Sequence, residues 1–105
     1  MSRVGEGIGA NLYIYKTPIV VGVAGALYLA ANKKRVAYRV FNDPANEDTM
    51  LLDYDANISQ TSTLIIIWPG KYWEDTGFDT CYKGPIYLLS GSADQEGFIE
   101  EVVTQ

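Results

Sequence analysis

The sequence is organised around one apolar stretch, Leu64-Ile65-Ile66-Ile67-Trp68, which is followed at once by Pro69-Gly70. Side chains branched at Cβ favour the extended strand over the helix, and a run this short has the length of a strand. Successive side chains of a strand point to opposite faces, and both faces of this run are apolar. The pattern therefore predicts a central strand of a β-sandwich, covered on both sides. We expect it to end at the Pro-Gly turn, and we expect Ile66→Asp to prevent folding.

Segments on either side of this stretch also have strand character. Residues 35–41 alternate, with Val36, Tyr38 and Val40 on one face, as in a half-buried strand. Breaks such as Thr17-Pro18 separate the segments. Further strands are predicted at residues 19–25, 26–29, 49–54, 71–74, 86–89 and 98–103, with one turn of helix over residues 26–31 as the alternative to the second of these. Strands that recur about every 8–12 residues are typical of an all-β fold, so we predict a single antiparallel β-sandwich of jelly-roll or immunoglobulin-like topology.

The chain has 105 residues, which is enough for one domain with its own core. Its start is rich in glycine, so residues 1–16 are predicted to form an N-terminal arm and residues 17–105 the sandwich. The arm ends in an apolar tip, which we expect to cross to a neighbouring chain and pair with a sheet edge there. In the alternative, the same tip is the first strand of the chain's own sandwich. The tip consists of Leu12, Tyr13, Ile14 and Tyr15.

Charge is distributed unevenly along the chain. Residues 1–39 contain six Lys and Arg and one Glu, for a net charge of +5, whereas residues 40–105 contain two Lys and twelve Asp and Glu, for a net charge of −10. This asymmetry favours either charge-guided contact with a partner or two solvated surfaces of opposite sign. An acidic chain of this kind is a poor candidate for binding nucleic acid. The longest apolar run, residues 19–31, is shorter than the roughly 20 residues of a membrane-spanning helix, so no membrane partner is expected.

Residues suited to catalysis are scarce. The sequence has no His, which is the commonest general base and metal ligand. Cys81 is the only cysteine, so no intrachain disulfide can form, and we expect a half-buried structural thiol. Acidic pairs such as Asp53 with Asp55, and Glu74 with Asp75, lack the spacing of a calcium-binding loop. We therefore predict no catalytic residue, no metal and no cofactor.

Tyr72 and Trp73 are adjacent aromatic residues that follow the Pro-Gly turn. Exposed aromatic side chains suit a protein interface or stacking on a sugar ring. In the alternative, one of the two packs back onto the sandwich. The predicted partner-binding residues are thus Leu12, Tyr13, Ile14, Tyr15, Tyr72 and Trp73.

Three short motifs punctuate the chain in a fixed order. They are Ala30-Ala31-Asn32-Lys33-Lys34-Arg35, which leads into a strand that ends at Asn42, then Ile65-Ile66-Ile67-Trp68-Pro69-Gly70, and finally Tyr82-Lys83-Gly84-Pro85-Ile86-Tyr87, with Glu100 or Glu101 near the C-terminus. With these motifs, residues 18–103 resemble small β-sandwich virion proteins of tailed bacteriophages, a group that includes capsid decoration (cement) proteins and head fibres.

The resemblance implies a structural, non-enzymatic virion protein, most simply a capsid decoration protein. Such a protein is assembled in the host cytoplasm and located on the capsid surface, where it binds the major capsid protein and copies of itself, with a trimer as one candidate state. The alternative function is a small carbohydrate-binding module that uses Tyr72 and Trp73.

Overall fold

The computed structural model describes residues 2–4, 12–77 and 80–104. These ranges contain nine strands and no helix. The strands are β1 (Ser2–Val4), β2 (Leu12–Val21), β3 (Ala26–Leu29), β4 (Arg35–Asn42), β5 (Met50–Asp53), β6 (Ile65–Ile67), β7 (Tyr72–Asp75), β8 (Ile86–Ser90) and β9 (Gln95–Thr104). The predicted all-β sandwich is confirmed.

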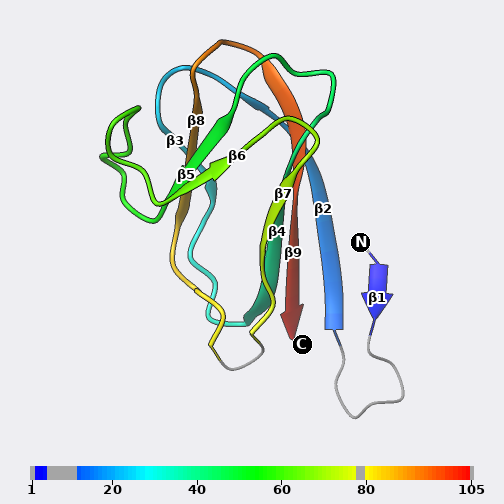
Figure 1. Ribbon diagram of the computed structural model, residues 1–105. Coiled ribbons are helices and arrows are strands. Elements are labelled where there is room, and N and C mark those ends of the chain that lie inside the picture. The colour runs from blue at the N-terminus through cyan, green and yellow to red at the C-terminus, as the bar shows by residue number, and fades with distance from the viewer. Residues whose placement is uncertain (1, 5–11, 78–79, 105) are drawn as a thin grey trace.

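Two antiparallel sheets form the two layers of the sandwich (Figure 1). One sheet has five strands in the order β1-β2-β9-β4-β7, and the other has four in the order β3-β8-β5-β6. The chain passes from one sheet to the other at every connection except β1–β2 and β5–β6. This is the strand order of a jelly roll, with β1 added beside β2. The structure thus decides between the two predicted topologies in favour of the jelly roll.

The core lies between the two sheets. Alternate side chains of β4 point into it, as the sequence predicts, and so do alternate side chains of β5, while β9 contributes Ile99 from its place between β2 and β4. Tyr38, Val40, Met50 and Leu52 are all buried there. Burial of one such side chain stabilises the fold by roughly 1.5–3 kcal/mol.

The apolar stretch at residues 64–68 is not the central strand, and that prediction is wrong. β6 forms one edge of the four-stranded sheet, whose central strands are β8 and β5. Ile67 is buried and Ile65 is half-buried, but Leu64, Ile66 and Trp68 are exposed. An apolar run indicates side chains that favour burial. The sequence alone does not show whether neighbouring strands of the same chain cover those side chains.

The predicted arm is also corrected by the structure. β2 runs without a break from Leu12 to Val21 and pairs with β9 along its whole length, so the boundary at residue 16 falls inside a strand. Pro18 does not interrupt β2 because β1 pairs only with residues 12–14, which leaves that side of Pro18 without a strand among the described residues. The structure thus agrees with the alternative, in which residues 12–15 belong to the chain's own sandwich. Residues 5–11 of the predicted arm lie outside the described residues.

Candidate functional site

The β6 edge carries a strip of exposed apolar side chains. β6 pairs with β5 on one side, and no strand in the described ranges pairs with its other side. Leu64, Ile66 and Trp68, which alternate along the chain, are 54%, 53% and 63% exposed. The free N–H and C=O groups of such an edge can pair with a strand from another chain.

A buried asparagine holds β6 in place. The Asn42 Nδ2 donates to the carbonyl oxygens of Ile67, at 2.9 Å, and Asp48, at 3.0 Å. The Gly70 N–H in turn donates to the Asn42 carbonyl oxygen at 2.8 Å, from a turn in which Gly70 adopts a φ of 79°. The edge strand is therefore held in a defined position by hydrogen bonds from the rest of the chain.

Opposite charges alternate across the outer face of the five-stranded sheet. Register places Lys16, Glu100, Arg39 and Glu74 in one row over four neighbouring strands. Arg39 lies 2.8 Å from Glu74 and 3.8 Å from Glu100. The basic first part of the sequence and its acidic remainder thus meet within one sheet, and this part of the charge asymmetry is balanced inside the molecule.

An aromatic row lies beside the charged row on the same face. Phe98 and Phe41 are paired in register and stack with their ring centroids 4.9 Å apart. The Lys16 ammonium lies 4.0 Å from the centroid of the Phe98 ring, and the Arg39 guanidinium lies 4.8 Å from that of the Tyr72 ring. The cationic groups of the same chain therefore cover part of this aromatic surface.

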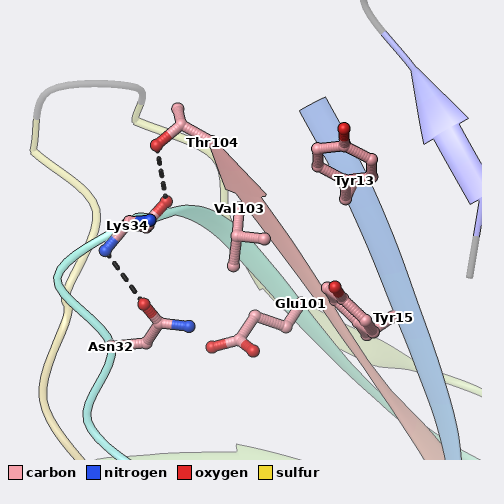
Figure 2. A pocket seen from close by; sticks show the side chains of 7 residues that line it. All are labelled: Tyr13, Tyr15, Asn32, Lys34, Glu101, Val103 and Thr104. Atoms are coloured by element: carbon pink, nitrogen blue, oxygen red, sulfur yellow. Dashed lines mark hydrogen bonds between the residues drawn. The ribbon is translucent and has the colours of Figure 1, made fainter. Parts of the chain in front are cut away.

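A second surface feature is an open hollow of about 600 Å³ at the end of the sandwich where β2 and β9 meet the β3–β4 connection (Figure 2). Side chains from these three segments line it. We call it the tyrosine hollow, and its lining residues are Tyr13, Tyr15, Asn32, Lys34, Glu101, Val103 and Thr104. Tyr13 and Tyr15 lie on the same face of β2, because they are two residues apart in a strand.

The carboxylate of the tyrosine hollow is fixed by a buried arginine. Arg35 is fully buried, and its Nε donates to a Glu101 oxygen at 2.8 Å. Its other nitrogens donate to the carbonyl oxygens of Ala30, Tyr82 and Gly84. These hydrogen bonds join β4 to three other parts of the chain, namely β9, the β3–β4 connection and the β7–β8 connection, so Arg35 organises this end of the molecule.

The structure separates the predicted partner-binding residues of β2. Tyr13 and Tyr15 meet in the tyrosine hollow, whereas Leu12 is buried and is not available to a partner. Ile14 points to the opposite face of the sheet, where it lines a smaller hollow of about 290 Å³. The predicted apolar tip is therefore not one contact surface, since neighbouring side chains of a strand face opposite ways.

Tyr72 and Trp73 are separated in the same way. Tyr72 is exposed beside Arg39, but Trp73 is half-buried, and its Nε1 donates to the Tyr38 hydroxyl at 3.0 Å. The alternative that one of the two aromatic residues packs onto the sandwich holds for Trp73. The two rings do not form a common platform for a sugar.

Cys81 lies in a cluster of polar aromatic residues inside the sandwich. The hydroxyls of Tyr38 and Tyr54 lie 2.7 Å apart, and the rings of Tyr54 and Tyr82 are stacked. Cys81 is buried, its thiol donates to the Tyr82 carbonyl oxygen at 3.4 Å, and burial raises the pKa of the thiol. The raised pKa keeps the thiol protonated, and the residue is more deeply buried than the half-buried thiol expected from the sequence.

Sequence reasoning did not identify Arg35 or Glu101 as functional or structural key residues. The motif that ends in Arg35 contains the signal, but spacing alone does not show that a basic residue at a strand start is buried.

Within the described ranges, no group of three or more His, Cys, Asp or Glu side chains is placed to hold a metal ion. The same part of the chain includes no helix of the length and hydropathy that crossing a membrane requires.

These features define an all-β jelly-roll domain with an exposed apolar edge. No known family model matches the sequence, and no curated protein matches it. A similar solved structure comes from a study of Bacillus endospore appendages, described there as a novel family of disulfide-linked pili. That chain is 15% identical, the match covers 99% of this chain and 96% of that one, and the TM-score is 0.50. At this identity the likeness shows a shared fold.

Proposed function

We propose that this chain is a non-enzymatic structural subunit that associates with copies of itself along the β6 edge. The observation that supports this most directly is the exposure of Leu64, Ile66 and Trp68 on a strand whose second edge pairs with no other strand among residues 2–4, 12–77 and 80–104. Monomeric proteins protect such edges with charged residues, proline or a covering segment. Residues 64–68 contain no charge, so the covering segment in this proposal comes from a second copy.

The other edge of the same sheet is the proposed partner surface. It is formed by β3, on which Leu27 is 52% exposed. Because β3 and β6 differ in sequence, pairing β6 of one copy with β3 of the next is a head-to-tail contact that can repeat without closing. The pilus origin of the similar fold supports an assembly of this repeating kind. Cys81 is buried, so the contact proposed for this chain is non-covalent.

The proposed setting is the surface of a virion, where the major capsid protein would be a second partner. Support for this setting comes from the motif resemblance to phage virion proteins, and it is independent of the contact along β6. Electron microscopy of particles or filaments isolated from the native source, with antibody labelling of this chain, tests the setting. Labelled capsids support it, and label confined to other structures contradicts it.

Sedimentation velocity of the purified protein tests the self-association itself. The native chain should form species larger than a monomer as its concentration rises, and Ile66→Lys should remain monomeric because it places a charge on the free edge. Val20→Lys is the matched control, since Val20 is 54% exposed but lies on β2 in the other sheet, and it should associate like the native chain. A native chain that stays monomeric, or equal loss of association in both variants, contradicts the proposal.

A further inference from the structure

We propose that the tyrosine hollow binds a saccharide chain. This inference is independent of the proposed self-association, because the hollow belongs to the five-stranded sheet and the β3–β4 connection, whereas the β6 edge belongs to the other sheet. It also differs from the sequence-based alternative, which placed sugar binding at Tyr72 and Trp73.

The two tyrosines offer an aromatic strip on one face of β2. Residues two apart in a strand are separated by roughly 7 Å, so the two rings can contact neighbouring parts of one saccharide. Each ring combines an apolar face with a polar hydroxyl, and a sugar unit likewise combines apolar C–H faces with hydroxyls. Tyr15 is 45% exposed, so its ring is accessible from solvent.

Polar groups opposite the tyrosines match the hydroxyls of a sugar. The Asn32 Oδ1 accepts from the backbone N–H of Lys34 at 2.9 Å, and its Nδ2 points toward the Glu101 carboxylate (Figure 2). One Glu101 oxygen is held by Arg35 at 2.8 Å. An amide donor next to a carboxylate acceptor can bind two adjacent hydroxyl groups of one ring.

The size of the hollow favours a saccharide over a small ion. Arg35 balances the charge of Glu101 from within the fold, and because Arg35 is fully buried it is not itself available to a ligand. The volume of about 600 Å³ is within the range of ligand sites, roughly 300–1,000 Å³. The hollow is open to solvent, so its lining is accessible to a ligand of this size.

The test is a glycan array that carries neutral and acidic oligosaccharides, probed with the native chain and with single variants. Native protein should bind a defined group of saccharides, and Tyr15→Ala and Asn32→Ala should each weaken binding by about tenfold or more. Tyr72→Ala is the matched control, because Tyr72 is 55% exposed on another strand, and it should bind like the native chain. Urea unfolding of each variant confirms that the fold is intact.

Three results would overturn the proposal: no saccharide retained by the native protein, equal loss of binding in Tyr72→Ala, or loss of self-association in Tyr15→Ala measured by sedimentation. The last result would assign the hollow to a protein contact. Ile66→Lys keeps this test separate from the proposed function, since that variant should lose self-association and keep saccharide binding.

Discussion

Arg35 and Glu101 form an ion pair between neighbouring strands, with 2.8 Å between the Arg35 Nε and a carboxylate oxygen. The Arg35 side chain is fully buried and that of Glu101 is 14% exposed. Charges withdrawn from water to this extent are tolerated only when each is paired and hydrogen-bonded. The stability of this end of the molecule therefore depends on the Arg35 side chain, which is the partner of the Glu101 carboxylate.

Arg35→Leu should lower the free energy of unfolding by about 3–5 kcal/mol. The substitution leaves the Glu101 carboxylate without its partner and removes the donors for the carbonyl oxygens of Ala30, Tyr82 and Gly84. Urea unfolding followed by fluorescence measures the change. Arg39→Leu is the control, because its ion pair is solvated and should contribute no more than about 1 kcal/mol. Similar losses in both variants would contradict the role assigned to Arg35.

Gly97→Ala should destabilise the protein by about 1–3 kcal/mol. A Cβ at this position would overlap the backbone carbonyl of Phe41 and lie 3.1 Å from the Met50 Cε. The carbonyl cannot move away without disturbing the ladder between β4 and β9. Gly22→Ala is the matched control, since a Cβ there meets no atom within 4 Å. Gly97→Ala should have a clearly lower midpoint of thermal unfolding than Gly22→Ala. Equal midpoints would show that the backbones of β4 and β9 move apart more easily than the structure indicates.

Stability should fall as the pH rises above about 10, the ordinary pKa of tyrosine. Burial raises the pKa of Tyr38 and of Tyr54, so these phenols stay protonated in the folded protein at a pH where the unfolded chain loses their protons. Below about pH 10 both states keep these protons and the stability is undiminished; above it, ionisation favours the unfolded state.

Tyr38→Phe tests this pH dependence. The variant should flatten the decline in unfolding free energy by up to about 1.4 kcal/mol per pH unit, measured by urea titrations between about pH 9 and 11. At neutral pH it should cost roughly 1 kcal/mol, because the hydroxyl also accepts a hydrogen bond from the Trp73 indole. An unchanged alkaline slope would show that Tyr38 ionises as readily in the folded chain as in the unfolded one.

Ile66→Asp should fold, in contrast to the expectation from sequence. Ile66 is 53% exposed, so an aspartate there stays solvated, and the unfolding free energy should change by no more than about 0.5 kcal/mol. Ile67→Asp is the partner experiment, because Ile67 is 2% exposed and the same substitution would bury an unpaired carboxylate. Circular dichroism should show a native spectrum for the first variant and an unfolded one for the second. Two unfolded variants would mean that both faces of β6 are covered within the chain.

The sequence predicts the strands of this fold well where apolar and polar side chains alternate along the chain. Residues 35–41 are predicted and found as β4, and Tyr38 and Val40 face the core as expected. Alternation succeeds there because a half-buried strand contacts water on one side only. Strand ends are less certain, since β9 begins at Gln95, three residues before the predicted start at residue 98.

Sequence reasoning fails where the outcome depends on strand order. The most apolar run is at an edge, and Pro18 lies within a strand because its neighbour on one side ends early. Both outcomes follow from which strands lie next to each other, and local composition does not contain that information. The candidate site has the same origin, because Tyr15, Asn32 and Glu101 come from distant parts of the chain and meet only after folding.

The enclosed position of Cys81 gives the molecule a built-in reporter of its own opening. Since the chain has no other thiol, the rate at which a soluble alkylating reagent modifies the native protein measures how often the sandwich admits solvent near Tyr82. The same isolation allows a second cysteine, introduced on β6 or β3, to carry a fluorophore without competition from the native thiol. The proposed self-association and the local opening of the sandwich could then be followed in one sample.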